Sequence, residues 1–256
     1  MFGGKMIDIH THILPHLDDG AKDTATAVAM LKQLRQQGVD TVVFTPHYYG
    51  RKSSPEQFIQ RRNASFERLK EQIPEGLTVR LGAELHFTGL NMPASDALCR
   101  LAIEGTKYIL VEFPFTTAWT GALLEKLSDF MRETGYTPIV AHVERYREVK
   151  KNPSLVSELI HMGCLIQVNA PAFLDRHEKK LAFALLKHGF VHCIGSDAHD
   201  MQTRSPNMST AKDAIIKAGY EEAWARAENI MEDVVCGKQV RVENGKPIKK
   251  VLGMYI

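Results

Sequence analysis

Cysteine is scarce in this sequence, and its spacing excludes two common uses of the residue. Four cysteines are spread over 256 residues, and no two of them form a C-x-x-C pair. Zinc knuckles and disulfide frameworks need closely or regularly spaced cysteines. We therefore expect reduced thiols that are mostly buried. The four residues are Cys99, Cys164, Cys193 and Cys236.

Long apolar runs and an excess of one charge are also missing. No stretch approaches the roughly 18 apolar residues of a membrane-spanning helix, and the first residues, MFGGKM, lack the apolar core of a signal peptide. The 32 basic residues nearly balance the 30 acidic residues, so no overall field attracts nucleic acid or an anionic membrane. We expect a cytoplasmic protein with no nucleic-acid partner and no stable membrane insertion. Any recognition of phosphate must then be local.

Linkers, repeats and low-complexity segments are absent as well. With 44% hydrophobic and 24% charged residues, the composition is that of an ordinary globular protein. The length suits one barrel-sized domain about as well as two small ones, and the unbroken pattern favours a single domain over residues 1–256. Because the pattern begins at Met6, we interpret residues 1–5 as a disordered or added extension.

The sequence does contain a regular alternation of short apolar runs with longer segments of helical period. The runs predict seven strands, which are 6-MIDIH, 41-TVVFTPH, 78-TVRLGAELH, 107-KYILVEF, 137-TPIVAH, 164-CLIQVNA and 191-VHCIGSD. The segments between them predict the crossover helices 24-TATAVAMLKQLRQQG, 55-PEQFIQRRNASFERLKEQI, 119-WTGALLEKLSDFMRETG, 153-PSLVSELIHMG and 178-EKKLAFALLKHG. Two or three further helices and a basic tail, 237-GKQVRVENGKPIKKVLG, follow residue 209.

Apolar strands that alternate with helices form a parallel sheet that is covered on both faces, so the fold class is α/β. Seven such units in this length favour a closed or nearly closed barrel, with an open doubly wound sheet as the alternative.

Almost every predicted strand ends in a side chain of metal-ligand type. Because the carboxyl ends of parallel strands open onto one face, these side chains are expected to converge there. Residues two apart in a strand point to the same side, so two ligands on one strand can share an ion. The strand-end residues are His10, His12, His47, Glu84, Glu112, His142, Asp197 and His199.

Buried carboxylates are costly unless they are paired with cations, and few Lys or Arg residues lie at these strand ends. Metal binding is therefore favoured over a network of salt bridges. Imidazole and carboxylate ligands without thiolate suit manganese, iron or zinc.

These blocks together resemble a known superfamily. H-x-H, T-P-H, G-A-E, V-E-F, 141-AHVERY and 196-SDAH follow one another as in the PHP (polymerase and histidinol phosphatase) superfamily. Within it, MIDIHTHILPHLDDG, GAELHF, LVEFP, PIVAHVERY and IGSDAH resemble the bacterial manganese-dependent protein tyrosine phosphatases of capsule and exopolysaccharide synthesis. The similarity runs from about Met6 to the helix near Cys236.

The resemblance implies a distorted TIM-like (β/α)7 barrel, the PHP fold, with three divalent ions, manganese foremost and iron or zinc as alternatives. It assigns His10, His12, Glu84 and Asp197 to the first ion. It assigns the bridging Glu84, Glu112 and His142 to the second ion. It assigns Asp19, His47 and His199 to the third ion. His16 is the alternative to Asp19, and a contact of His86 with metal is left open, whereas Asp18 is not assigned as a ligand.

The resemblance also implies the chemistry. Clustered divalent ions acidify water and neutralise phosphoryl oxygens, and the family picture has a metal-bridging hydroxide as the nucleophile. No C-x5-R phosphatase loop surrounds any cysteine. Arg145 resembles the phosphate-binding arginine of the family, with a rim salt bridge to Glu144 or Glu148 as the alternative. Arg204 is a second candidate for contact with phosphate.

A phosphotyrosine ring needs an apolar rim beside the metal site. Candidates next to the ligand-bearing strand ends are Tyr48, Tyr49, Phe87, Phe113 and Phe115, although packing in the core or in loops is the usual role of such residues. The segment 51-RKSSPEQFIQRR adds positive charge near the mouth or is simply a solvated helix face.

The predicted function is hydrolysis of phosphotyrosine on a protein, with a bacterial tyrosine autokinase tail as the expected partner. A small-molecule phosphatase such as histidinol-phosphate phosphatase is the alternative. A scaffold that binds metal without turnover is disfavoured, because every expected ligand is present. The sequence leaves the oligomeric state open.

Overall fold

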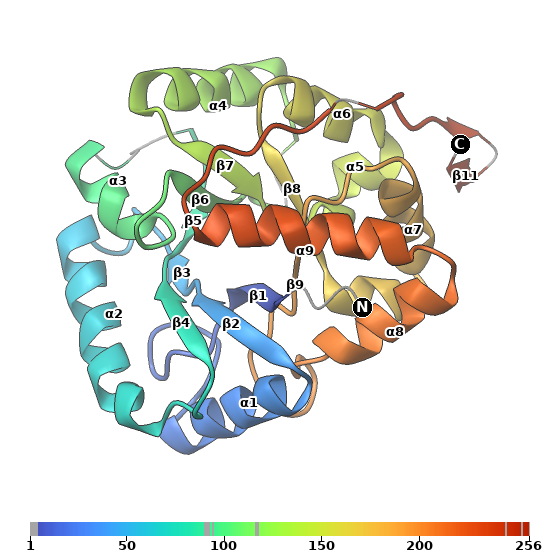
Figure 1. Ribbon diagram of the computed structural model, residues 1–256. Helices are drawn as coiled ribbons and strands as arrows, with labels where there is room; N and C mark the ends of the chain where they lie inside the picture. Colours follow the sequence, from blue (N-terminus) through green and yellow to red (C-terminus); the bar gives the residue numbers. More distant parts are fainter. Residues whose placement is uncertain are drawn as a thin grey trace.

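The computed structural model describes residues 5–89, 93, 95–115, 118–243, 245–251 and 253–255. Most of the predicted extension 1–5 therefore lies outside the described residues, and Lys5 is exposed. Parallel strands form the centre of the molecule (Figure 1). They are β1 Met6–Thr11, β2 Val39–Phe44, β3 His47–Tyr48, β4 Thr78–Leu81, β5 Glu84–His86, β6 Tyr108–Glu112, β7 Thr137–Val140, β8 Leu165–Asn169 and β9 Cys193–Gly195.

The strands curl into a nearly closed barrel. Two sheets are formed, one in the order β1-β2-β4 and one in the order β3-β5-β6-β7-β8-β9. The last strand returns to the first, because the Asp197 N–H donates to the His10 carbonyl at 2.9 Å and the His12 N–H donates to the Ala198 carbonyl at 2.9 Å. These bonds join the two ends of the sheet order, and the predicted distorted (β/α)7 barrel is confirmed.

The second and third predicted strands are each split in two, which distorts the barrel. Pro46 separates β2 from β3 and has no N–H for the ladder, while Gly82 and Ala83 separate β4 from β5. The buried Arg62 spans this break and donates to the Gly82 carbonyl at 2.9 Å. Since β3 and β5 begin after the breaks, they carry His47 and Glu84 toward the mouth of the barrel.

Helices surround the strands (Figure 1). Those covering the predicted segments are α1 Thr24–Gln36, α2 Pro55–Leu69, α4 Gly121–Thr134, α6 Ser154–His161, α7 Lys179–Lys187, α8 Met208–Lys217 and α9 Glu221–Val235. Not predicted were α3 Ser95–Leu101, α5 Arg147–Lys151 and the 3-10 turns η1 Lys70–Gln72, η2 Val143–Arg145 and η3 Ala170–Phe173. In the tail, β10 Lys250–Val251 and β11 Met254–Tyr255 form a small antiparallel pair.

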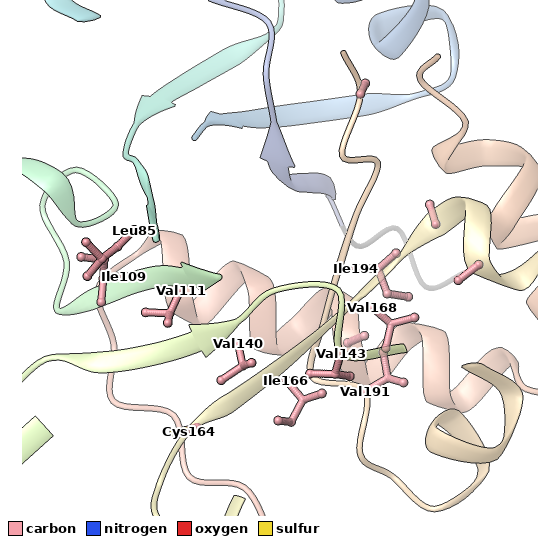
Figure 2. Close-up of a cluster of buried hydrophobic side chains, with 14 of the residues drawn as sticks. Leu85, Ile109, Val111, Val140, Val143, Cys164, Ile166, Val168, Val191 and Ile194 are labelled. Atoms are coloured by element: carbon pink, nitrogen blue, oxygen red, sulfur yellow. The ribbon is translucent and has the colours of Figure 1, made fainter. Parts of the chain in front are cut away.

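Two apolar layers hold the barrel together. Ile109, Val111 and Val168 belong to the larger cluster, which packs between strands and helices (Figure 2). Leu110 and Leu165 alternate with these residues and belong to the smaller cluster, with α9 residues packed against it. In Figure 1, α9 crosses in front of the strands.

Cys164 and Cys193 are buried in these layers, and Cys99 and Cys236 are exposed, so the expectation of mostly buried thiols holds for two of the four. Within the described part of the chain, no helix combines the length and apolar character that crossing a bilayer requires.

Candidate metal centre

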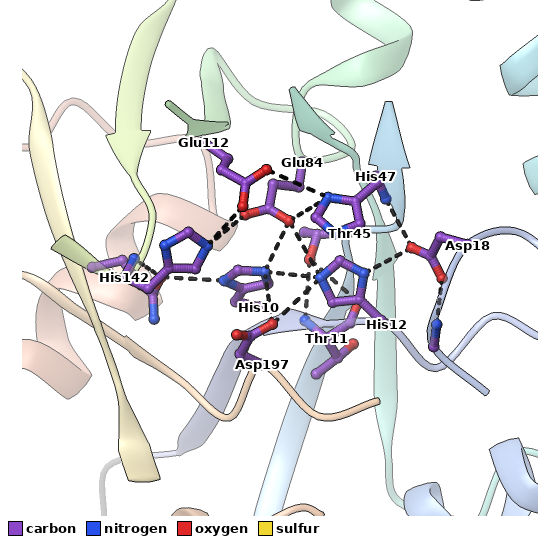
Figure 3. Close-up of polar contacts among 12 residues, drawn as sticks. His10, Thr11, His12, Asp18, Thr45, His47, Glu84, Glu112, His142 and Asp197 are labelled. Atoms are coloured by element: carbon purple, nitrogen blue, oxygen red, sulfur yellow. Dashed lines mark hydrogen bonds and ion pairs between the residues drawn. The ribbon is translucent and has the colours of Figure 1, made fainter. Parts of the chain in front are cut away.

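The carboxyl ends of the strands bring the predicted ligands into one cluster, and Figure 3 shows the part of it around Glu84. Period-two alternation explains part of this, because Glu112 lies two residues beyond the inward-facing Leu110 on β6. The nine predicted ligands are His10, His12, Asp19, His47, Glu84, Glu112, His142, Asp197 and His199. Most are buried, whereas the Asp19 side chain is 64% exposed.

Unusual backbone conformations place several of these side chains. His142 and Asp197 have φ angles of 36° and 54°, in the left-handed region that residues with a Cβ rarely adopt. Gly195 lies against His10, and a Cβ there would come within 2.5 Å of the His10 Cβ. Gly20 lies against the His12 carbonyl, and a Cβ at this position would come within 2.0 Å of the carbonyl oxygen. Only glycine at these two positions leaves room for the first strand to pack so closely against β9 and against the loop that contains Gly20.

The first group of side chains surrounds the His10 and His12 rings. Their Nε2 atoms are 3.0 Å apart. Both face Oδ1 of Asp197 at 3.5 Å, and Oε2 of Glu84 lies 3.4 Å from His10 and 3.3 Å from His12. Two imidazole nitrogens and two carboxylates thus point at the same small volume (Figure 3).

The other ring nitrogens of these histidines are held by acceptors. Nδ1 of His12 lies 2.7 Å from the Asp18 carboxylate, and Nδ1 of His10 lies 3.2 Å from Oε1 of Gln167. Likewise, Nδ1 of His199 donates to the Asp197 carbonyl at 2.8 Å. We therefore assign the proton of each neutral ring to Nδ1, which leaves a lone pair on Nε2. Lone pairs that face carboxylates repel unless a cation lies between them.

The second group contains Glu84, Glu112 and His142. Nε2 of His142 lies 3.0 Å from Oε1 of Glu84 and 3.6 Å from Oε1 of Glu112. His47 also approaches this group, since its Nδ1 is 2.9 Å from Oε2 of Glu84 without hydrogen-bond geometry. Nδ1 of His86, the residue whose contact with metal the sequence left open, lies 3.2 Å from Oε2 of Glu112.

The third group contains Asp19, His47 and His199. Oδ1 of Asp19 lies 3.6 Å from Nε2 of His47 and 3.5 Å from Nε2 of His199. The His12 ring stacks on His199 with 3.9 Å between centroids, so the first and third groups adjoin. By contrast, His16 is exposed and belongs to none of the metal-compatible groups found among the described residues.

The chemistry of this donor set fits divalent metal. Oε2 of Glu84 and Nε2 of His199 are buried and have no hydrogen-bond partner among the residues that the structure describes. Although burial lowers the pKa of His12, the Asp18 and Glu84 carboxylates raise it well above its usual value. Positive charge therefore stabilises the cluster. Protons on the histidines supply part of this charge, and bound metal ions would supply the rest.

Two arginines add positive charge at the mouth. Arg145 donates to Oδ2 of Asp197 at 3.2 Å, and Arg204 donates to the same oxygen at 2.6 Å. The alternative of a rim salt bridge from Arg145 to Glu144 or Glu148 is not what the structure shows. Glu144 is buried and accepts from the Asn169 N–H, while Glu148 pairs with Lys151. Burial raises the pKa of Glu144 to about 8.

An open cavity of about 270 Å³ lies over the cluster and contains both arginines. Of the five predicted rim aromatics, only Tyr49 and Phe115 line it. The Phe115 ring stacks on His142 and lies 4.7 Å from the Arg145 guanidinium carbon. The other three are buried in the hydrophobic core and do not form the rim, because each lies one residue from a ligand-type side chain and points away from it. They are Tyr48, Phe87 and Phe113.

Sequence reasoning missed three buried polar residues below the cluster. Gln167 accepts from the His142 N–H and donates to Asn169, whose amide donates to Oδ2 of Asp197 at 2.9 Å. Asp8 accepts from the Ser196 N–H, and burial raises its pKa to about 6. The available signal was polar residues inside otherwise apolar strands, where burial requires partners.

Comparison with known proteins identifies the family. The model of the family described as "Capsular polysaccharide synthesis, CpsB/CapC" matches residues 6–232. The chain belongs to the CpsB/CapC family. The resemblance found in the sequence is thereby confirmed.

Relatives of this CpsB/CapC chain include two tyrosine-protein phosphatases. YwqE of Bacillus subtilis (strain 168) is 37% identical over 98% of this chain and 100% of YwqE. CpsB of Streptococcus pneumoniae is 34% identical over 83% of this chain and 90% of CpsB. A structure described as "Crystal structures of YwqE from Bacillus subtilis and CpsB from Streptococcus pneumoniae, unique metal-dependent tyrosine phosphatases" matches with a TM-score of 0.80 and 31% identity, covering 95% of this chain and 100% of that chain.

Proposed function

We propose that this CpsB/CapC-family chain is a metal-dependent phosphatase that hydrolyses phosphotyrosine on proteins. The observation that carries the proposal is the set of three imidazoles whose Nδ1 protons are held by acceptors, while their Nε2 lone pairs face carboxylates. The names of the relatives at 37% and 34% identity support the same activity.

We infer three divalent ions, with manganese as the first choice and iron or zinc as alternatives. The proposed ligands of the first ion are His10, His12, Glu84 and Asp197. Those of the second are Glu84, Glu112 and His142. Those of the third are Asp19, His47 and His199. Asp18 is proposed to hold His12 in position rather than to bind metal, because its carboxylate is taken up by Nδ1 of His12 and the His47 N–H.

Ions held there would supply positive charge for the phosphoryl oxygens and the acidity that turns water into a nucleophile. Arg145 and Arg204 supply the guanidinium donors. Both side chains are 35% exposed and line the cavity, so a phosphate that enters can take over donors now turned to Asp197. The Phe115 ring beside Arg145 fixes the plane of its guanidinium fork. Arg145 is the proposed catalytic residue, and both arginines are proposed to bind substrate.

The rim favours an aromatic leaving group on a protein surface. Tyr49 and Phe115 line the open cavity, where they can contact a phenyl ring. We further propose that the protein acts as a single domain in the cytoplasm on the phosphorylated tail of a bacterial tyrosine kinase that controls capsule or exopolysaccharide synthesis. The family description and the names of the relatives support this setting.

The metal requirement is tested by elemental analysis of protein purified without added metal, together with activity before and after chelation. We expect about three equivalents of metal in the fully loaded protein, and activity that is restored best by manganese. Full activity in metal-free protein would refute the proposal.

The substrate class is tested by comparing hydrolysis of a phosphotyrosyl peptide with that of histidinol phosphate under the same metal loading. The aromatic rim predicts the higher kcat/KM for the peptide. A preference for histidinol phosphate would instead assign the chain to small-molecule phosphatases.

The residue roles are tested by two substitutions and a control. His142→Ala should abolish turnover. Arg145→Ala should retain the metal content of the protein but lower kcat/KM roughly 100-fold, because a donor to developing charge is lost. Arg147→Ala removes an exposed arginine two residues away and should change neither quantity. Turnover at the original rate in either of the first two variants contradicts the role given to that residue.

A further inference from the structure

A second pocket adjoins the metal cavity. It has a volume of about 270 Å³ and shares Asp19, His47 and Tyr49 with that cavity. Its outer wall comes from the loop after β3 and from the first turns of α2, through Lys52 and Arg61. A substrate peptide that extends from the metal cavity past Tyr49 therefore enters this pocket directly.

The two cations of the pocket have no carboxylate partner among the described residues. Lys52 lies with its ammonium group 4.3 Å from the centre of the Tyr49 ring. Arg61 donates to the Ser53 hydroxyl at 3.3 Å. These neutral contacts position both charges without neutralising them, and the pocket floor of Leu17 and Phe58 is apolar.

The two acidic residues of the pocket contact groups other than Lys52 and Arg61. The Asp18 carboxylate accepts from His12 and from the His47 and Gly20 N–H groups (Figure 3). The Asp19 carboxylate faces His47, His199 and Arg204. The pocket therefore presents positive charge outward, whereas the neighbouring metal cavity presents carboxylates to cations.

We propose that this pocket binds the carboxylate of an acidic residue close to the phosphotyrosine of a peptide substrate. The inference rests on the proposed function and extends it from the phosphotyrosine to its neighbours in sequence. An extended peptide advances about 3.3 Å per residue, so a side chain within three positions of the phosphotyrosine reaches the adjoining pocket. Lys52 and Arg61 are the residues that determine this specificity.

The experiment uses the metal-loaded protein and a set of phosphotyrosyl peptides. Each peptide carries one glutamate at one of three positions on either side of the phosphotyrosine, and each has a partner with glutamine at the same position. Glutamine keeps the shape and removes the charge. We expect one or two positions at which kcat/KM for the glutamate peptide is about threefold to tenfold higher, as for two exposed ion pairs.

The variant Arg61→Glu should reduce this ratio to one or below, and Lys52→Glu should act in the same direction. Arg61→Lys keeps the charge and should retain most of the preference. Arg68→Glu is the matched control, because this exposed residue lies on the same face of α2, about 10 Å further along the helix. Ratios within one variant are compared, so a general loss of activity cancels.

Equal kcat/KM values for the glutamate and glutamine peptides at all positions would refute carboxylate binding in the pocket. They would leave the proposed phosphatase function intact. An equal fall of the ratio in Arg61→Glu and Arg68→Glu would also refute carboxylate binding in the pocket, since general surface charge would then explain the preference. If no phosphotyrosyl peptide is hydrolysed while p-nitrophenyl phosphate is, the proposed function fails and the pocket's role fails with it.

Discussion

Buried side chains below the candidate metal centre orient the groups that we propose as ligands. Gln167 is buried, accepts a hydrogen bond from Nδ1 of His10 and donates one from its amide N–H to Oδ1 of Asn169, whose own amide donates to Asp197. One amide thus sets the tautomer of a histidine and, through its neighbour, the orientation of a carboxylate. Amides suit this task because each offers a donor and an acceptor in one plane.

Replacing this amide tests its role. Gln167→Leu should leave a folded protein whose manganese affinity is lower by roughly 10-fold to 100-fold, because His10 loses the acceptor for Nδ1. Gln167→Glu keeps an acceptor and should retain more affinity. Calorimetric titration of the metal-free variants with manganese measures this. An affinity in Gln167→Leu equal to that of the unchanged protein would show that the amide does not position His10.

At the residue scale, the sequence predicts the side chains that converge at the mouth of the barrel better than the buried residues that hold them in place. His10, Glu84 and Asp197 were predicted to lie together because strand ends in a parallel barrel share one face, and the structure places them together. Gln167 and Asn169 were not assigned, because amides carry no ligand signature and their partners depend on which strands are neighbours. Tyr48 and Phe113 lie beside ligands in sequence yet point into the core, which alternation along the strands decides.

One buried histidine lies directly before β9 and bonds to the backbone of β8. His192 accepts from the Ile166 N–H through Nδ1 at 3.0 Å and is 2% exposed. Burial, aided by the charge of Arg226, lowers its pKa from 6.5 to about 4. The folded chain therefore holds this ring neutral between β8 and β9, where a second proton would break the contact.

The free energy of unfolding should consequently depend on pH through His192. The unfolded chain takes up a proton near pH 6.5 and the folded chain only near pH 4, so this stabilisation is complete above pH 6.5 and declines below it. The loss reaches roughly 3 kcal/mol at pH 4, because each pKa unit corresponds to about 1.4 kcal/mol.

Urea unfolding of the parent protein and of His192→Asn between pH 4 and 7 measures the contribution of His192 to the free energy of unfolding. Asparagine keeps an acceptor near the position of Nδ1 and cannot titrate. The difference in free energy between the two proteins should shrink as the pH falls. Parallel curves at all pH values would contradict the assignment.

Helices and strands were predicted well where the hydrophobic pattern repeats over many residues, and poorly where the pattern is short or interrupted. The helix 24–38 was found from its apolar period, and it forms as α1 after the Asp23 cap. The short α3 and α5 were missed, since one or two turns give too few repeats for a period. The second predicted strand is split at Pro46 because proline has no N–H for the strand ladder. The direction that the chain takes after Pro46 depends on the neighbouring strands of the barrel, which the sequence does not specify.

The molecule as a whole concentrates negative charge at one end of the barrel. Five carboxylates lie in or beside the cluster against the two guanidinium groups, and they are Asp18, Asp19, Glu84, Glu112 and Asp197. Folding without metal must bring these groups together, which costs free energy. Metal ions offset this repulsion only in the folded state, because the unfolded chain does not assemble the ligands.

Metal binding should therefore stabilise the entire fold. At free manganese about a thousandfold above the dissociation constant, one site adds about 4 kcal/mol to the free energy of unfolding, which raises Tm by roughly 10 °C in a chain of this size. Thermal unfolding followed by circular dichroism, with manganese or with chelator, measures the shift. A Tm that is the same in both would contradict this coupling.

The bonds that close the barrel also set the order of events during synthesis. His10 and His12 are synthesised early, but they meet Asp197 and His199 only when the segment after β9 has bonded to β1. A nascent chain that stops before this point has isolated histidines and carboxylates, and these hold metal weakly. Complete assembly of the candidate metal centre therefore requires nearly the whole barrel, because the first strand and the segment after the last strand both contribute side chains to it.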